Sequence, residues 1–342
     1  MKSERAFAAE DAQSHNNCFN LIRLVAALQV AFGHMIVHLD LGIPTPIVNI
    51  FSFFRGVPIF FALSGFFIWQ SVSRCETFKQ YMQKRFWKIF PELWCGVLLE
   101  LFAIIILYYE KIEWLKFGLF AIGQSTIFPF WTPNFLRGYG IGTPNGALWT
   151  MGILIQFYVI VWPLYKFLHR KSKRRYGAIF LVSLGVAAFS PLLEEVVPVL
   201  LYKLYKQTIF PYFWIFVFGI LIAEYKEKVL PIAKRYWYVF TIASVIFMMT
   251  GIDIHSIYPI FRHLFQIIAI IGIGYAFPKI EIQTDISYGL YLYHMTVVNV
   301  MVVFGLTGRN IYLFMALAIS CILALISTKT ISAFSKRKVK PN

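Results

Sequence analysis

The chain carries little charge for its length. Only 14% of its 342 residues are Asp, Glu, Lys or Arg, whereas 59% are hydrophobic. A soluble globular domain carries about 25% charged residues, and this much apolar material excludes an intrinsically disordered chain. Apolar runs of roughly 20 residues are typical of helices that cross a bilayer. The composition therefore predicts an all-α polytopic membrane protein.

Cysteine is also scarce. The four cysteines form no CxxC pair, which argues against a disulfide framework and gives no ligand spacing for a metal site. We therefore expect no metal and no tightly bound cofactor. Residues 1–20 are polar and lack the apolar core and small-residue cleavage site of a signal peptide. The first apolar stretch should remain in the protein as a membrane span.

Acidic residues are few, 16 against 32 Lys and Arg, for a net charge of +16. In a soluble protein this excess would suggest a nucleic-acid partner. In a membrane protein it is the expected enrichment of Lys and Arg in cytoplasmic loops, so we expect no nucleic acid. The hydropathy predicts ten spans, at about residues 21–40, 56–73, 89–109, 147–168, 177–193, 208–224, 236–252, 260–278, 286–306 and 310–330.

An eleventh apolar stretch, residues 114–130, is interrupted by glycine, proline and polar residues. Counting it as a span would place the basic segment 169–175 outside the cell, against the positive-inside tendency. We therefore predict ten helices with both termini in the cytoplasm, and a re-entrant or interfacial segment at 114–130. The expected organisation is a cytoplasmic tail at 1–20, one integral-membrane domain at 21–330 and a basic cytoplasmic tail at 331–342.

Ionisable side chains within spans are costly and usually functional. Arg23 and His34 are 11 residues apart in the first span, so a helix places them on one face, about 16 Å apart along its axis. One interpretation is structural: Arg23 extends to the cytoplasmic surface and His34 only bonds a neighbouring helix. The other is that His34 is a general base acting on a hydroxyl.

Four further segments carry polar or aromatic groups that have two interpretations or an unusual place. Ser64-Gly65 in the second span is either a close-packing site for another helix or part of a reactive site. The basic and aromatic segment 79–91 either contacts anionic lipid at the inner face or holds phosphates, such as those of coenzyme A. Trp149 is consistent with an interfacial aromatic residue, whereas His294 lies about two turns inside the ninth span.

Five motifs occur in order along the chain and together resemble the membrane-bound acyltransferase-3 family. They are Arg23-x10-His34, Val57-Pro-Ile-Phe-Phe-Ala-Leu-Ser64-Gly65-Phe, Arg85-Phe-Trp-Lys88-Ile-Phe-Pro91, Asn145-Gly-Ala-Leu-Trp149-Thr with Phe157-Tyr158, and Ser287-Tyr288-x-x-Tyr291-Leu-x-His294. The resemblance implies a ten-helix enzyme of the bacterial plasma (inner) membrane. Such an enzyme moves an acyl group, usually acetyl, from cytoplasmic acyl-CoA to a hydroxyl of a surface or secreted glycan or glycolipid. The resemblance is to the short form, without an extracytoplasmic C-terminal domain.

On this hypothesis His34 is the general base or transient acyl acceptor, with Arg23 as a further catalytic residue. Arg85, Lys88 and Arg23 would hold the phosphates of acyl-CoA. The acceptor site or channel would be lined by further residues of the same motifs: Ser64, Trp149, Gln156, Tyr158, Tyr291 and His294. The sequence departs from the family at Leu154, where members commonly carry a glutamate, and Gln156 or an acid elsewhere would have to substitute. Lys88 replaces an arginine, which keeps the charge but loses the bidentate fork.

Two alternatives stay open at the level of sequence. The chain could be a polytopic transporter or exporter of a glycan intermediate, with Arg23 and His34 lining a proton or substrate path. It could also be a catalytically degenerate member of the family, because the usual carboxylate near Leu154 is missing.

Overall fold

The structure, a computed structural model, describes residues 17–126, 128–168, 173–277, 280, 282 and 284–332. Within these ranges the chain is helical and contains no β-strand. The predicted cytoplasmic tails, 1–20 and 331–342, lie almost entirely outside the described residues, as does the centre of the basic segment 169–175.

A helix occupies each of the ten stretches in which the hydropathy predicts a span. These helices are α2 (Phe19–His38), α4 (Gly56–Val72), α5 (Phe78–Tyr108), α7 (Trp149–Leu168), α8 (Lys173–Val196), α10 (Phe213–Glu224), α11 (Lys226–Thr250), α12 (Ile260–Ala276), α13 (Ser287–Val303) and α14 (Ile311–Ser327). The described residues also form shorter elements: α3 (Thr45–Ser52), α6 (Trp114–Gln124), α9 (Val199–Tyr205), η1 (Tyr109–Lys111), η2 (Asn134–Gly138), η3 (Gly146–Leu148) and η4 (Thr328–Ser332).

Six helical stretches of the described chain are long and apolar enough to cross a membrane. They are Phe19–His38, Thr45–Val72, Phe78–Lys111, Gly146–Leu168, Lys173–Val196 and Ile311–Ile331. Helices α10 and α12 are apolar but shorter. The chain is thus a multi-pass membrane protein, while the number of ten crossings and the side on which each end lies stay predictions.

The segment predicted to be re-entrant or interfacial forms α6, which has 11 residues. A helix of this length extends only about 16 Å, whereas the hydrocarbon core of a bilayer is about 30 Å thick. Phe117 and Phe120 of α6 pack with Ile104 of α5 in one cluster. Helix α6 is therefore too short to span a bilayer and is attached to the end of α5.

The exposed side chains of α5 show which surface faces lipid. Leu98, Phe102 and Ile106 follow one another at four-residue spacing and are each about 60% exposed. Glu100 lies two residues from Leu98, on the opposite side of the helix, and is 1% exposed. An apolar exterior around buried polar groups is the arrangement that a bilayer requires.

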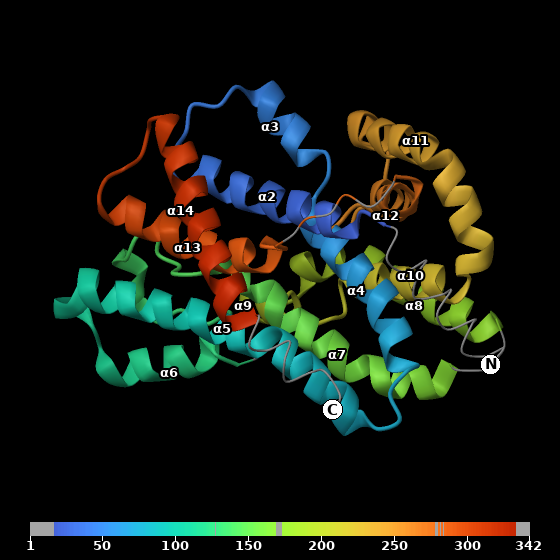
Figure 1. The fold of residues 1–342 in the computed structure, drawn as a ribbon, viewed down its shortest axis with the longest axis horizontal. Helices are drawn as coiled ribbons and strands as arrows, with labels where there is room; N and C mark the ends of the chain where they lie inside the picture. The colour runs from blue at the N-terminus through green and yellow to red at the C-terminus, as the bar shows by residue number, and fades with distance from the viewer. Residues whose placement is uncertain are drawn as a thin grey trace.

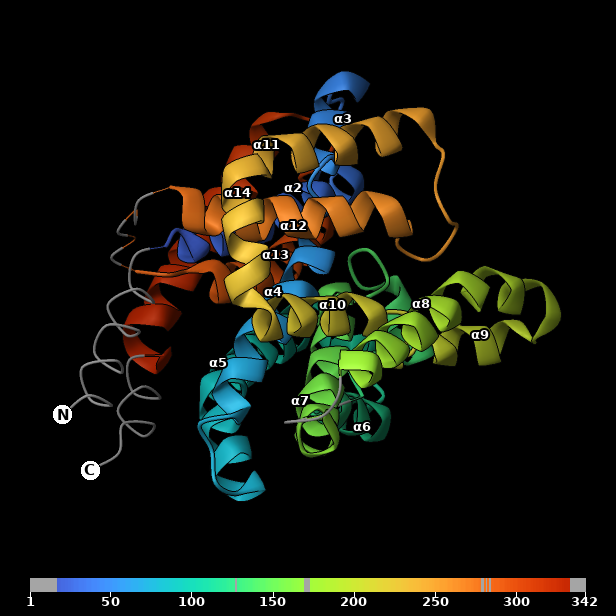
Figure 2. The ribbon, with the colours of Figure 1, turned by 90° about the vertical axis from the view of Figure 1, so that its right-hand side faces the viewer.

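Helices α4 and α13 form the centre of the molecule. Helix α4 packs against α2, α7, α10 and α12, whereas α13 packs against α2, α5 and α14. Both views place α4 near the middle of the helices (Figures 1 and 2), with α11 and α12 together on one side and α5 and α6 on another. Most residues of α13 are buried, including the polar Tyr291, His294 and Asn299.

Two glycines bring α4 and α10 into backbone contact. A Cβ added at Gly65 would meet the carbonyl oxygen of Phe216, and a Cβ added at Gly219 would meet that of Ala62. Small residues at such crossings let membrane helices approach closely, since lipid provides no hydrophobic force between them. Gly65 therefore belongs to a helix-packing site, as one of the two interpretations predicted, whereas Ser64 beside it lines a cavity.

We expect Gly219→Ala to destabilise the protein by about 1–3 kcal/mol, the usual cost of overpacking a tight site. The added methyl group would force α10 away from the backbone of α4. Thermal unfolding of the detergent-purified protein would measure the loss. Gly185→Ala in α8 is the control, because a Cβ there meets nothing within 4 Å. Equal melting temperatures for the two variants would contradict the packing argument.

Candidate active site

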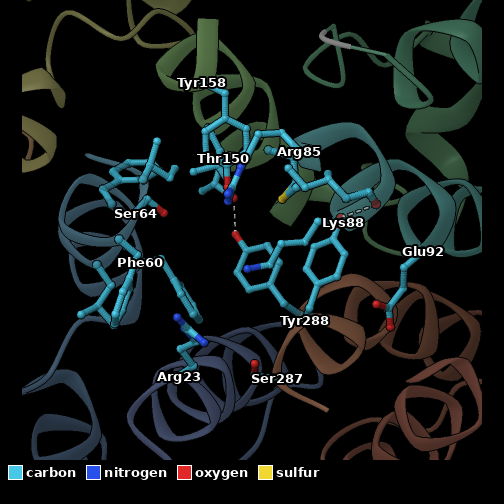
Figure 3. A pocket seen from close by; sticks show the side chains of 18 of the residues that line it. Arg23, Phe60, Ser64, Arg85, Lys88, Glu92, Thr150, Tyr158, Ser287 and Tyr288 are labelled. Atoms are coloured by element: carbon cyan, nitrogen blue, oxygen red, sulfur yellow. Dashed lines mark hydrogen bonds between the residues drawn. The ribbon is translucent and has the colours of Figure 1, made fainter. Parts of the chain in front are cut away.

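A cavity of about 730 Å³ lies between α2, α4, α5, α7 and α13. Figure 3 shows side chains from these helices converging on it, with Arg23 on one side and Arg85 and Lys88 on another. Its polar and charged lining comes from residues far apart in sequence: Arg23, Ser64, Lys84, Arg85, Lys88, Glu92, Thr150, Tyr158, Asp285, Ser287, Tyr288 and Tyr291.

One end of the cavity is basic. Helix α5 contributes three cations to the lining, Lys84, Arg85 and Lys88, all within about one turn of the helix. Of these, Lys88 is exposed at the surface. Arg85 donates from Nη2 to Oγ of Ser71 at 2.6 Å, and its guanidinium lies 5.7 Å from the ring centre of Tyr81. These contacts fix the Arg85 guanidinium, and Lys84 donates to Sγ of Cys75 at 3.7 Å. Three cations of one helix in the cavity lining are suited to several phosphate groups.

Arg23 of α2 approaches the same region from the opposite wall. Its guanidinium lies 5.0 Å from the ring centre of Phe67 and donates from Nη1 to Oδ1 of Asn20 at 3.2 Å. Asp285, also in the cavity lining, accepts hydrogen bonds from the backbone N–H and the hydroxyl of Ser287 and so fixes the beginning of α13. The basic end therefore also contains carboxylates, which limits its net positive charge.

Phe60, Thr150 and Tyr291 form another part of the cavity lining. The hydroxyl groups of Thr150 and Tyr291 are 2.6 Å apart, and the Tyr291 hydroxyl also donates to the carbonyl oxygen of Ala147 at 3.0 Å. The Tyr291 ring lies edge-on to Phe60 with centroids 5.8 Å apart. The hydrogen bonds hold this tyrosine in the wall of the cavity.

Immediately beyond Tyr291 lie His34 and His294, paired through a hydrogen bond. Nδ1 of His34 is 2.8 Å from Nε2 of His294, and Nδ1 of His294 is 3.1 Å from the carbonyl oxygen of Leu290. A carbonyl oxygen only accepts, so Nδ1 of His294 carries the proton and its Nε2 accepts from Nδ1–H of His34. This tautomer assignment leaves the lone pair of His34 Nε2 available as a base.

The two histidines differ in their exposure to solvent. His294 is 0% exposed, whereas His34 is partly exposed. The His294 ring contacts Tyr291 with centroids 5.9 Å apart, although neither histidine lines the cavity itself. The accessible imidazole is thus oriented by a buried one, as in other sites where a base is held by a second group.

Asparagine side chains attach the η2–η3 loop to α13 beside this pair. Asn299 accepts from the backbone N–H of Ile141 at 2.9 Å and donates to the carbonyl oxygen of Pro144 at 2.7 Å. Asn145 donates to the carbonyl oxygen of Leu292 at 2.9 Å. Gly140, at φ +52°, lies so close to the Asn299 amide that a side chain could not fit. The loop that precedes α7 is therefore held in one position.

The structure brings six of the ten predicted site residues to one cavity and places four outside its lining. Arg23, Ser64, Arg85, Lys88, Tyr158 and Tyr291 line it. His34 and His294 form the pair beyond its end. Trp149 lies in an aromatic group with Phe61 and Tyr212, at 6.5 and 5.4 Å, and the amide of Gln156 donates to the carbonyl oxygen of Gln207.

Leu154 stands where members of the family commonly carry a glutamate, and the structure shows what surrounds that position. Leu154 lines the cavity, whereas Gln156 bonds a loop away from it, so Gln156 does not replace the carboxylate there. The cavity does contain two other carboxylates, Glu92 and Asp285. Glu92 accepts from the hydroxyl of Ser327 at 2.9 Å. Acid groups are thus present in the cavity, but on α5 and before α13.

The sequence pattern did not identify several residues that the structure places at the site. Lys84 and Glu92 are one helical turn from the predicted Lys88, which is the signal that could have identified them. Asn299 stands alone in the apolar run Val297-Val298-Asn299-Val300-Met301, and an amide at that depth signals a partner on another element. Thr150 is part of the quoted Trp149-Thr motif, yet only the structure shows its bond to Tyr291.

The architecture and the site define a multi-pass membrane protein whose five motif segments surround one cavity and a histidine pair. Comparison with known proteins gives the family. The acyltransferase-3 profile, described as an acyltransferase domain, matches residues 16–329. The chain belongs to this family, as its motifs predicted, and is an acyltransferase that transfers groups other than aminoacyl groups.

Two characterised relatives match over most of their length. Nodulation protein 10 of Rhizobium leguminosarum bv. viciae is 28% identical over 330 residues, 88% of each chain. An O-acetyl transferase of Shigella phage Sf6 is 28% identical over 311 residues, 84% of this chain and 86% of the phage protein. No solved structure matches the chain.

We expect Gln156→Leu to keep acyl transfer within about threefold of the parent protein, since the amide bonds Gln207 away from the cavity. The variant should lose about 1 kcal/mol of stability with that hydrogen bond. Initial rates with acetyl-CoA, together with thermal unfolding, would separate the two effects. A hundredfold loss of rate with unchanged melting would place Gln156 in the chemistry instead.

Proposed function

We propose that the protein transfers an acyl group, specifically acetyl, from cytoplasmic acyl-CoA to a hydroxyl group of a surface or secreted glycan or glycolipid. The observation that carries the proposal is the alignment of three features. Lys84, Arg85 and Lys88 line the cavity, Tyr291 of the same lining contacts His294, and His294 orients His34 as a base. The protein would act in the bacterial plasma (inner) membrane, with anionic lipid around its basic inner face.

The donor fits the cavity in both charge and length. The phosphates of coenzyme A would bind Arg85, Lys88 and Arg23, whose donors suit phosphate oxygens. From Arg23 to His34 the helix rises about 16 Å, a distance that the flexible pantetheine arm can cover. The thioester would then lie beside Thr150 and Tyr291, whose bonded hydroxyl groups form the polar wall there.

In the simplest reaction, Nε2 of His34 removes the proton of the acceptor hydroxyl as its oxygen attacks the thioester carbonyl carbon. The carbon–sulfur bond then breaks, and the leaving sulfur takes the proton from His34. Acyl-CoA and alcohol become ester and free coenzyme A, without net uptake or release of protons. Alternatively, His34 accepts the acyl group first and passes it to the hydroxyl in a second step.

His294 would keep the reactive tautomer in place. Its Nε2 accepts from His34 Nδ1–H, so the His34 imidazolium formed during transfer would be stabilised by a fully buried partner. The carbonyl oxygen of Leu290 fixes the ring of His294 in turn. A base that is held in one tautomer by another side chain is also found in the Ser-His-Asp triad.

The acceptor would approach from the opposite side, where Trp149 lies among aromatic residues. Apolar ring faces of this kind stack on sugars, while the η2–η3 loop, attached through Asn299, borders the same region. The name of the phage relative, an O-acetyl transferase, supports a hydroxyl acceptor. A transporter of a glycan intermediate would need neither a coenzyme A site nor a base of fixed tautomer.

We expect His34→Ala to reduce acetyl transfer by at least a hundredfold, within the range that general-base catalysis contributes. Release of free coenzyme A by purified protein, with a crude glycan fraction as acceptor, would measure the loss. His38→Ala is the matched control on the same helix and should stay within about threefold. Equal transfer by His34→Ala and the parent protein would disprove the assignment of the base.

We expect Lys88→Gln to raise KM for acetyl-CoA by roughly tenfold while leaving kcat nearly unchanged, because a phosphate contact is lost far from the reacting atoms. The effect should shrink as salt is added, since the contact is exposed. Lys79→Gln removes the same charge from an exposed position of α5 outside the cavity. An equal rise in KM for Lys79→Gln would indicate general electrostatic attraction and not a site.

A further inference from the structure

A second cluster of polar groups lies outside the lining of the cavity. It is formed by the 253–259 loop, the first turns of α12 and the residue that precedes α4. Arg262 is 8% exposed, and His263 and Gln266 are 0% exposed. Nothing in the proposed donor chemistry uses these residues. Buried polar and ionisable side chains are costly in a membrane protein, so the burial of these three residues requires a separate explanation.

The cluster contains four buried side-chain atoms without a hydrogen-bond partner among the described residues. They are Nε of Arg262, Nε2 of His263, Oε1 of Gln266 and Oγ of Ser256. Other atoms of three of these side chains are bonded. Arg262 donates from Nη2 to the carbonyl oxygens of Ser52 and Phe53 at 2.8 and 3.1 Å, and His263 Nδ1 and Gln266 Nε2 bond the carbonyl oxygens of Pro259 and Arg55. Buried polar atoms are normally paired, so four orphans together point to a bound polar molecule.

The charge of the cluster is positive. Arg55 is exposed, and its guanidinium forms no hydrogen bond or ion pair within the described chain, yet it is close enough to Arg262 and Tyr258 to interact electrostatically. Asp253 is the carboxylate nearby, but its oxygens accept the backbone N–H groups of Ile254, Phe261 and Arg262. One occupied carboxylate thus faces two guanidinium groups.

A chain of buried aromatic rings connects the cluster with Trp149. The ring of Tyr258 contacts His263 at 5.4 Å and Tyr212 at 5.9 Å, and Tyr212 contacts Trp149 at 5.4 Å between centroids. Tyr258 is also near enough to Tyr291, in the lining of the cavity, for the two to interact. The cluster is thus connected through these rings to the residues that contact the histidine pair.

We propose that Arg55 and Arg262 bind an anionic group of the acceptor, so that the substrate is a sugar carrying a phosphate or a carboxylate. The proposal deepens the proposed function and rests on it, because it assumes a glycan acceptor. Guanidinium groups match the geometry of both oxyanions. Binding the anion would place the neighbouring sugar over Tyr258 and Tyr212 and a hydroxyl towards His34.

The unpaired atoms fit such a ligand better than an inorganic anion alone. Nε of Arg262 and the hydroxyl of Ser256 donate. Oε1 of Gln266 accepts, as does Nε2 of His263, whose Nδ1 lies 2.6 Å from the carbonyl oxygen of Pro259 and therefore carries the proton. A bare phosphate at neutral pH offers mainly acceptors, whereas sugar hydroxyls both donate and accept. The mixed set thus favours an anionic sugar.

The test uses the full chain purified in detergent and three sugar probes. Glucose 1-phosphate carries a phosphate, glucuronate carries a carboxylate, and glucose carries no charge. Binding would be measured by calorimetric titration. At least one anionic probe should bind at least tenfold more tightly than glucose. Tighter binding of glucose 1-phosphate identifies a phosphate-bearing acceptor, and tighter binding of glucuronate identifies an acidic sugar.

Arg55→Gln should weaken binding of the preferred anionic probe by about tenfold, the effect of losing one charge-assisted contact. Because Arg55 is exposed, this variant should fold. Arg309→Gln is the matched control, since Arg309 is an exposed arginine of the α13–α14 loop and should change binding less than twofold. Equal binding of all three probes would overturn the proposal, as would equal losses in the two variants.

Acetyl-CoA binding by the same preparations separates the two hypotheses. If acetyl-CoA binds the parent protein and both variants equally while the sugars are not distinguished, the anionic acceptor is wrong and the proposed function stands. If acetyl-CoA does not bind the parent protein, the proposed function fails first, whatever the sugars do.

Discussion

Polar side chains within a bilayer have no water to bond, so each must be satisfied by another part of the protein. Helix α13 meets this constraint for much of the molecule. Tyr288 donates to the carbonyl oxygen of Ile89, Tyr291 to that of Ala147, and Asn299 holds the η2–η3 loop. The hydrogen bond from His34 to His294 belongs to the same series. These bonds fix α13 against α2, α5 and α7, and the cavity is the space that they leave.

The same constraint separates the protein into two chemical environments. Lys84, Arg85 and Lys88 of α5 line one part of the cavity, and Lys88 is exposed. His34 instead lies between two other imidazoles, those of His38 and His294, and His294 is fully buried against Tyr291. On the proposed function, the first environment would attract an anionic donor and the second would hold the base.

The sequence predicted the helices well because each depends on local composition. Every hydropathy maximum corresponds to a helix, and the interrupted stretch at 114–130 contains only the short α6. Arg23, Arg85 and Lys88 were also found, since cations in or beside apolar helices are conspicuous. What the sequence could not show is which helices lie side by side. The bond between His34 and His294 joins residues 260 positions apart, and the direction of the Gln156 amide depends on the loop at Gln207.

The contact of Phe60, Thr150 and Tyr291 has a consequence for the cell if the protein acts as proposed. An enzyme that takes one substrate from each side of a membrane risks becoming a leak for ions and protons between the compartments. Two hydroxyl groups of the cavity lining are bonded to each other and to the backbone, and the ring that carries one of them packs against Phe60 and His294. On the proposed function, this contact would oppose the leak and so help to preserve the electrochemical gradient that energises the membrane.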